Sequence, residues 1–231
     1  MDQYIKNQKE NNSVSIKAGN VILNGNVVIP SGARGIVLFV HGSGSSRFSP
    51  RNRFVAEELN KKGLATLLFD LLTQEEEIID ERTAELRFDI ELLAKRLVKI
   101  TDWVQKNPET NNLNIGYFGA STGAGAALVA AAERPSVIKA VVSRGGRPDL
   151  AGRRLVEVKC PTLLIVGGYD EVVIDMNRDA LAQLKLEKNM VIVPGATHLF
   201  EEKGKLEEVA IHAGNWFLKY LGGTKQNDVQ G

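Results

Sequence analysis

The sequence of 231 residues contains a single cysteine, Cys160, and only three histidines. One cysteine excludes an internal disulfide framework and fits a reducing compartment. No apolar run approaches the ~18 residues that a membrane-spanning helix needs. The polar stretch 1–12 also lacks the apolar core of a signal peptide. These absences predict a cytoplasmic protein that makes no contact with a membrane.

A marked charge of either sign is absent too, because 29 Lys and Arg residues face 28 Asp and Glu residues and the formal net charge is +1. Such a balance gives no global attraction to nucleic acid or to an anionic membrane. The acidic run Glu75-Glu76-Glu77 has no histidine or cysteine at a useful ligand spacing, which indicates a solvated face instead of a metal site. We therefore expect no metal, no cofactor and no nucleic-acid partner.

What the chain does contain is ordinary for a globular protein: 43% hydrophobic and 25% charged residues. Its length allows a sizeable core. No linker, repeat or low-complexity block interrupts it, so we predict a single domain over residues 1–231, with loose tails at 1–12 and 224–231. The oligomeric state is expected to be a monomer or a small homo-oligomer.

Buried apolar runs alternate with helical patterns along most of the chain. A pair of antiparallel strands is expected within 14–29, turning at Asn24-Gly25, and the charged stretch 73–87 is expected to be a solvated connection or a short surface helix. The later strands are predicted at 35–40, 64–72, 114–120, 137–143, 161–167 and 190–193, and the helices at 50–62, 88–106, 122–133, 175–185 and 206–221. This alternation predicts an α/β fold with a mainly parallel, doubly wound sheet, helices on both faces and no cap domain.

The motif Gly119-Ala120-Ser121-Thr122-Gly123 stands between an apolar run and a stretch of small residues. A serine at the apex of a strand, tight turn and helix is the context in which a G-x-S-x-G match marks a nucleophile. The backbone of such a turn is strained, so its neighbours must lack bulk. A glycine-rich turn that binds phosphate is the alternative, but neither a Gly-Lys-Ser/Thr nor a G-x-G-x-x-G pattern follows.

The histidine that could activate this serine is His198. It follows the last predicted strand and precedes the last helix, and the chain order Ser, Asp, His is that of the α/β-hydrolase arrangement. His41 precedes the predicted oxyanion loop, where a structural role is expected. His212 lies inside the last helix, where a surface or core role is expected.

The remaining groups of the predicted site are a carboxylate and two backbone donors. Asp170 follows the strand at 161–167 and is predicted to orient the histidine, with Asp149 and Asp175 as alternatives. A tetrahedral oxyanion needs N–H donors that are already in place. The N–H of Thr122, next to the serine, and the N–H of Ser43, after His41-Gly42, are the candidates.

Four motifs in this order resemble the α/β-hydrolase superfamily, and the small size without an inserted cap resembles its dienelactone-hydrolase-like branch. The motifs are His41-Gly42-Ser43-Gly44, Gly119-Ala120-Ser121-Thr122-Gly123, Gly168-Tyr169-Asp170 and Gly195-Ala196-Thr197-His198. The resemblance implies that Ser121, Asp170 and His198 form the catalytic triad and that Ser43 and Thr122 donate to the oxyanion.

Two further stretches, 144–150 and 69–72, are similar to a bacterial subgroup that is sometimes fused to phosphoribosyltransferase domains. The chain departs from dienelactone hydrolases proper in one respect, because they use a cysteine nucleophile where this sequence has Ser121. Cys160 precedes Pro161 at the start of a predicted strand, at the wrong end of the sheet, and is predicted to be a small buried thiol.

Three arginines, Arg47, Arg144 and Arg147, follow predicted strands and could bind a substrate carboxylate or phosphate. Pairing with local acids such as Asp70 or Asp149 is the favoured alternative. The sequence as a whole predicts a serine hydrolase that acts on small carboxylic esters or thioesters through an acyl-enzyme. Acyl transfer to another acceptor, or a non-catalytic ligand-binding module on the same fold, are the alternative functions.

Overall fold

The computed structural model describes residues 13–223, so the tails predicted at 1–12 and 224–231 lie outside the described residues. Within this range an eight-stranded sheet has the order β1-β2-β4-β3-β5-β6-β7-β8. The strands are β1 Ser13–Ala18, β2 Val21–Val28, β3 Gly35–Val40, β4 Ala65–Phe69, β5 Asn114–Ala120, β6 Ile138–Arg144, β7 Thr162–Gly167 and β8 Lys188–Val193. Strands β3 to β8 are mutually parallel, and β1 and β2 are antiparallel additions at one edge. The predicted α/β architecture is confirmed.

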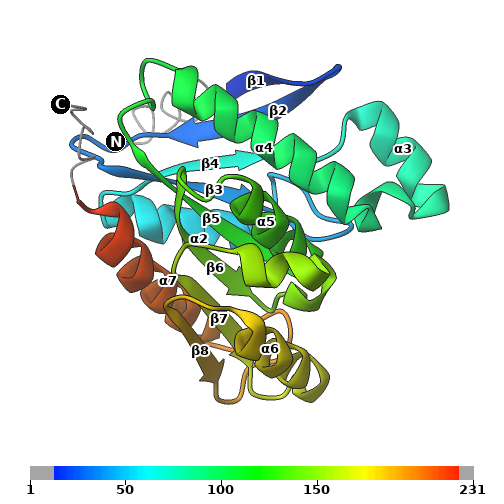
Figure 1. Ribbon diagram of the computed structural model, residues 1–231, viewed down its shortest axis with the longest axis vertical. Coiled ribbons are helices and arrows are strands. Elements are labelled where there is room, and N and C mark those ends of the chain that lie inside the picture. The colour runs from blue at the N-terminus through cyan, green and yellow to red at the C-terminus, as the bar shows by residue number, and fades with distance from the viewer. Residues whose placement is uncertain (1–12, 224–231) are drawn as a thin grey trace.

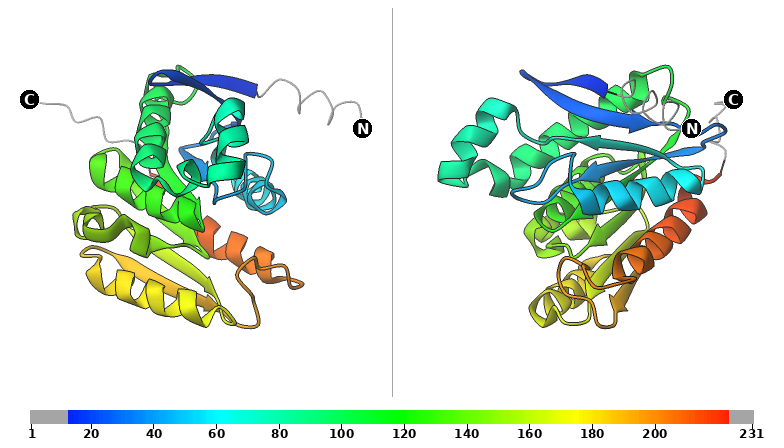
Figure 2. Two further views of the ribbon diagram at one scale, coloured as in Figure 1. Left: turned by 90° about the vertical axis from the view of Figure 1, so that its right-hand side faces the viewer. Right: turned by 180° about the vertical axis from the view of Figure 1, so that it is seen from behind.

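Helices cover both faces of the sheet (Figure 1; Figure 2). Helices α4 Ile90–Lys106, α5 Thr122–Glu133 and α6 Glu171–Gln183, with the 3₁₀ segment η2 Pro148–Glu157, lie on one face, and α2 Pro50–Lys61 and α7 Lys205–Leu221 lie on the other. Strands β3, β4 and β5 are buried along their whole length, because a strand covered on both sides must be apolar throughout. No helix within residues 13–223 is long and apolar enough to cross a membrane.

The turn between the first two strands lies at Gly19-Asn20, so the prediction of a turn at Asn24-Gly25 is wrong. Gly19 has a φ of +74°, which suits a tight turn. Gly25 lies inside β2, where it pairs with Phe69 of β4. A Cβ on Gly25 would lie 3.1 Å from Leu67 and 3.2 Å from Val14. Close packing between neighbouring strands therefore explains this glycine.

The structure corrects the predicted start of one helix and shows which of two predicted forms the charged stretch after β4 adopts. Helix α6 begins at Glu171, directly after Asp170, and not at 175, so Asp175 belongs to the helix and not to the strand end. The charged stretch after β4 forms a surface helix, α3 Gln74–Thr83, followed by a 3₁₀ turn, η1 Leu86–Phe88. Thr73 and Glu76 close its first turn as a capping box. In Figure 1, α3 projects beyond the end of β4, next to the edge where the parallel strands end.

Candidate active site

Ser121 occupies a sharp turn between β5 and α5, with φ 50° and ψ −125°. A non-glycine residue at positive φ is strained and marks a backbone that the surrounding structure constrains. A Cβ on Gly119 would lie 2.5 Å from the Cα of Ala124, and one on Gly123 would lie 2.3 Å from the carbonyl oxygen of Val40. Both glycines are therefore required by close backbone approach, as the motif predicts.

The ring of His198 is joined to a carboxylate: its Nδ1 lies 2.6 Å from Oδ2 of Asp170. Asp170 ends the turn after β7, and His198 lies in the loop between β8 and α7. The rival carboxylates contact arginines instead, since Asp149 pairs with Arg147 and Asp175 pairs with Arg178. Because Nδ1–H donates to Asp170, the opposite nitrogen Nε2 is left free to accept a proton.

Ser121 and His198 approach the same short segment at the end of β6. The N–H of Ser121 donates to the carbonyl of Arg144 at 3.3 Å, and a Cβ on Gly145 would lie 3.6 Å from Cε1 of His198. Within residues 13–223 no hydrogen bond joins the Ser121 hydroxyl to the His198 ring. Contacts of this kind are often long without substrate and shorten in the reacting complex.

The two candidate oxyanion donors contact each other across the site. The N–H of Ser43 donates to the Thr122 hydroxyl at 2.8 Å, so an oxyanion would have to share that N–H or replace the hydroxyl as its acceptor. Thr122 is the first residue of α5, where backbone N–H groups lack partners within the helix. A Cβ on Gly42 would lie 2.9 Å from Cβ of Ser121, so a glycine there lets the Ser43 loop reach the serine.

His41 holds two loops together and does not reach the serine. Its Nε2 accepts the Leu71 N–H at 3.1 Å and its Nδ1 lies 2.9 Å from the Gly42 carbonyl. The ring is therefore neutral with its proton on Nδ1. Burial lowers the pKa of His41, and this effect outweighs the opposing contributions of the Gly42 carbonyl and Asp70.

A pH dependence of stability follows from this lowered pKa. A protonated His41 could not accept the Leu71 N–H, so the stability it contributes is complete above about pH 6.5 and is lost as pH falls below that value. We expect the free energy of unfolding to decrease with a slope of at most about 1.4 kcal/mol per pH unit from this group. Urea unfolding between pH 7.5 and 5 measures it.

The variant His41→Gln should flatten this part of the stability curve. Its matched control is His212→Gln in α7, which keeps the His41 contacts intact. If the control flattened the curve and His41→Gln did not, the assignment of the titration to His41 would be wrong.

The three candidate arginines have different environments. Arg47 forms an ion pair with Asp70, and Arg147 forms one with Asp149, so the structure shows the favoured local pairing for both. Arg144 is 6% exposed and forms no ion pair with any described carboxylate. Among the described residues its guanidinium forms one hydrogen bond, from Nη2 to Oδ1 of Asn52 in α2, at 3.3 Å.

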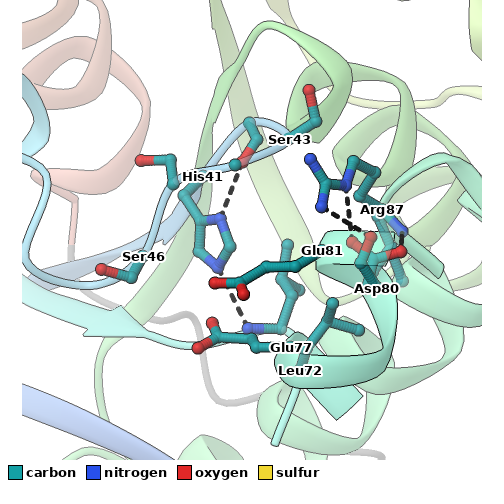
Figure 3. Close-up of a pocket in the computed structure, with 13 residues that line it drawn as sticks. His41, Ser43, Ser46, Leu72, Glu77, Asp80, Glu81 and Arg87 are labelled. Atoms are coloured by element: carbon teal, nitrogen blue, oxygen red, sulfur yellow. Dashed lines mark hydrogen bonds and ion pairs between the residues drawn. The ribbon is translucent and has the colours of Figure 1, made fainter. Parts of the chain in front are cut away.

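A cavity of about 250 Å³ lies against the Ser43 loop (Figure 3). Ser121, Asp170 and His198 do not line it, and among the described residues it meets the candidate site at Gly42 and Ser43. The other lining residues come from the Ser43 loop, from the end of β4, from α3 and from η1 and α4: His41, Gly44, Ser45, Ser46, Leu71, Leu72, Glu77, Asp80, Glu81, Arg87 and Leu93. The sequence pattern did not predict that residues of α3 (Glu77, Asp80 and Glu81) line a cavity beside the candidate site.

The wall that α3 gives to the cavity is acidic. Figure 3 shows His41, Glu77 and Glu81 converging on the cavity, with Asp80 bound to Arg87. Burial, and then the neighbouring Asp70 carboxylate, raise the pKa of Glu77. A substrate group with an added negative charge is therefore disfavoured on this side of the site.

The family model and the solved structures agree with one another. A family model described as "Dienelactone hydrolase family" matches residues 23–218. The crystal structure of a dienelactone hydrolase from Anabaena variabilis is similar at 67% identity and a TM-score of 0.89, over 90% of this chain and 97% of that chain. An α/β serine hydrolase without lid from Xanthomonas campestris shares the fold, with 19% identity and a TM-score of 0.72 over 92% of this chain and 95% of that one.

Curated relatives from Mycobacterium tuberculosis carry a different name, "Putative phosphoribosyl transferase". They are 57% identical over 210 residues, which is 91% of this chain and 46% of theirs. The chain thus spans about half the length of the curated relatives it matches, and their name refers to the longer proteins.

Proposed function

Because the chain belongs to the dienelactone hydrolase family, we propose that it is a serine hydrolase that cleaves small carboxylic esters or thioesters through an acyl-enzyme. The observation that carries this proposal is the backbone of Ser121, held at φ 50° on the turn between β5 and α5. The His198–Asp170 pair at the same edge of the sheet supplies the base that a serine hydroxyl needs.

The first half of the proposed reaction forms the acyl-enzyme. Ser121 Oγ attacks the ester carbonyl while Nε2 of His198 takes its proton, and Asp170 stabilises the resulting imidazolium through Nδ1–H. The N–H groups of Thr122 and Ser43 stabilise the oxyanion, a contribution on the order of 3 kcal/mol per donor in comparable sites. Collapse of the tetrahedral intermediate breaks the bond to the alcohol or thiol, which leaves with the proton from Nε2.

The second half restores the enzyme. Water attacks the acyl group on Ser121, His198 takes a proton from that water, and the same proton returns to Ser121 Oγ as the carboxylic acid leaves. Cys160 takes no part in this scheme. Cys160 is buried, and burial raises its pKa to about 12. It precedes β7, at the amino end of the parallel strands, whereas Ser121 follows β5 at the carboxyl end.

Two other functions use the same fold and are separated by simple assays. An acyltransferase would give more ester product than acid when an added alcohol competes with water. A non-catalytic binding module would not react with a fluorophosphonate, because it has no activated serine. The oriented His198 ring favours catalysis, since a binding module has no need of a poised base.

The substrate range is expected to favour short acyl chains of about two to four carbons, since each methylene contributes about 0.8 kcal/mol only when it is buried. The cavity of about 250 Å³ is small and is lined largely by polar side chains. We expect kcat/KM to fall from acetate and butyrate to octanoate and palmitate esters of p-nitrophenol. Emulsified triglyceride should not raise the activity.

Exposed apolar side chains on α3 could favour long acyl chains instead. The sequence suggests a polar segment, yet Ile78 and Ile79 are 54% and 56% exposed on that helix. If they pressed against lipid as a lid does, activity would rise with octanoate, palmitate or the emulsion, and the preference for short chains would be wrong. The double variant Ile78→Ser/Ile79→Ser would then remove the rise.

A further inference from the structure

Arg144 is a buried cation that forms no ion pair with any carboxylate in residues 13–223. Its side chain leaves the end of β6, and its Nε has no hydrogen-bond partner among the described residues. Other arginines that are buried or half-buried have a carboxylate: Arg96 pairs with Glu76, Arg87 with Asp80 and Arg134 with Asp102. An unpaired charge away from water is costly, so this exception calls for a partner.

The surroundings of the guanidinium are positive. Asn52, which contacts it, is the third residue of α2, and Arg51 is the second. The first turn of α2 contributes the positive end of the helix dipole and the N–H of Arg51, since Pro50 has no N–H and the Asn52 N–H donates to the Ser49 hydroxyl at 3.3 Å. Burial, and then the charge of Arg51, lower the pKa of Arg144 to about 10. Glu201 pairs with Arg51 and not with Arg144.

The same residue touches both sides of the candidate active site. Its carbonyl accepts the N–H of Ser121, and its guanidinium lies 5.9 Å from the ring of Phe200, two residues after His198. A group bound at the Arg144 guanidinium would therefore lie at the same end of the parallel strands as Ser121 and His198.

The two faces of the site carry opposite charge. The cavity wall formed by α3 presents Glu77 and Glu81, on the side where Leu93 of α4 packs. Arg144 points to the other side of the sheet, toward α2 and Phe200. An anionic group is disfavoured at the first position and stabilised at the second, so charge alone orients a substrate across Ser121.

We propose that Arg144 and the first turn of α2 form an anion-binding subsite, so that the ester hydrolysed at Ser121 carries a carboxylate or phosphate group. The inference rests on the proposed hydrolase function for the reaction, but the anion site itself can be tested without it. A guanidinium offers two parallel N–H donors, which suits either anion.

Binding is measured first, by the thermal unfolding of the whole chain with and without benzoate or inorganic phosphate. A ligand that binds the folded state raises the unfolding temperature. We expect a rise with at least one of the two anions, the larger rise identifying the preferred anion chemistry. The rise should be absent in Arg144→Met and retained in Arg53→Gln, a matched control on the exposed side of α2.

Hydrolysis is then compared within pairs of esters that differ in charge alone. The acyl-side pair is mono(4-nitrophenyl) adipate and its methyl ester, and the alcohol-side pair is 3-carboxyphenyl acetate and 3-carbamoylphenyl acetate. Wild type should prefer the anionic member of at least one pair roughly 10- to 100-fold in kcat/KM, as for one charge-assisted contact. Arg144→Met should lose that preference, so that the ratio of kcat/KM between the anionic and the neutral member of each pair falls to about one.

The failures are distinguishable. If wild type hydrolyses the neutral esters but shows no preference in either pair and no thermal shift, the anion subsite is wrong and the proposed function stands. If the anions bind through Arg144 but no ester is hydrolysed, the proposed function is wrong. Should Arg144→Met fail to fold, Arg144→Lys keeps the charge without the paired donors and should lower the preference for the anionic ester.

Discussion

Ser121→Ala should abolish ester hydrolysis and leave the fold intact. The hydroxyl is the proposed nucleophile, and removing the nucleophile of a triad lowers kcat by on the order of 10⁵- to 10⁶-fold in comparable enzymes. The substitution removes one oxygen from a half-buried residue whose side chain forms no capping hydrogen bond. Its stability should therefore change by well under 1 kcal/mol.

The measurement is kcat/KM for p-nitrophenyl acetate together with the urea-unfolding midpoint. Ser136→Ala, an exposed serine after α5, is the matched control and should retain full activity. Wild-type turnover by purified Ser121→Ala would mean that another residue attacks the ester, and the assignment of Ser121 as the nucleophile would be wrong.

Asp170→Asn should lower kcat by roughly three to four orders of magnitude. The carboxylate accepts the proton on Nδ1 of His198, whereas an amide can donate to that nitrogen and so favour the tautomer with its proton on Nε2. A ring protonated on Nε2 cannot accept the proton of Ser121. KM should change far less than kcat, because Asp170 does not contact the ester in the proposed scheme.

Asp149→Asn and Asp175→Asn are the controls for this prediction. Each carboxylate pairs with a half-buried or exposed arginine, and exposed pairs contribute about 0–1 kcal/mol. Both variants should keep activity within a few-fold of wild type. If Asp149→Asn were the crippling change, the acid would lie after β6 and the proposed relay would have to be rebuilt around η2.

The parallel core of the fold could be predicted because burial on both faces leaves a local signature. The run Gly35–Val40 is apolar at every position after its glycine and forms β3 as expected. The turn after β1 was not predictable in the same way. Asn24-Gly25 has the composition of a tight turn, but its pairing with β4, more than 40 residues later in the chain, outweighs that local preference.

The start of α6 is a second feature that the sequence did not predict correctly. A helix can begin as soon as the strand ends, and Glu171 in its first turn suits the helix dipole. Hydrophobic spacing favours the later residues and does not mark that start. The error matters for the site, because it left Asp175 as a rival carboxylate when the residue lies in the first two turns of a helix.

Some features of the candidate site could be predicted from the sequence, and others depend on contacts that only the structure shows. Chain order and strand ends predict Ser121, His198 and Asp170 as candidate site residues, because the carboxyl ends of parallel strands meet at one edge. The partners of the arginines depend on contacts across the sheet, so the pairing of Arg47 with Asp70, and the lack of a paired carboxylate at Arg144 within residues 13–223, are visible only in three dimensions. The acidic cavity wall on α3 also depends on contacts between distant segments, so it too is visible only in the structure.

The most direct test of the proposed mechanism is to identify the residue that reacts with a fluorophosphonate. The protein is labelled, digested and examined by peptide mass spectrometry, with p-nitrophenyl acetate present in a parallel sample as a competitor. The proposed mechanism predicts one adduct, on Ser121, which is reduced by the competitor and absent from Ser121→Ala. An adduct on a different residue, or a folded protein that forms none, would contradict it.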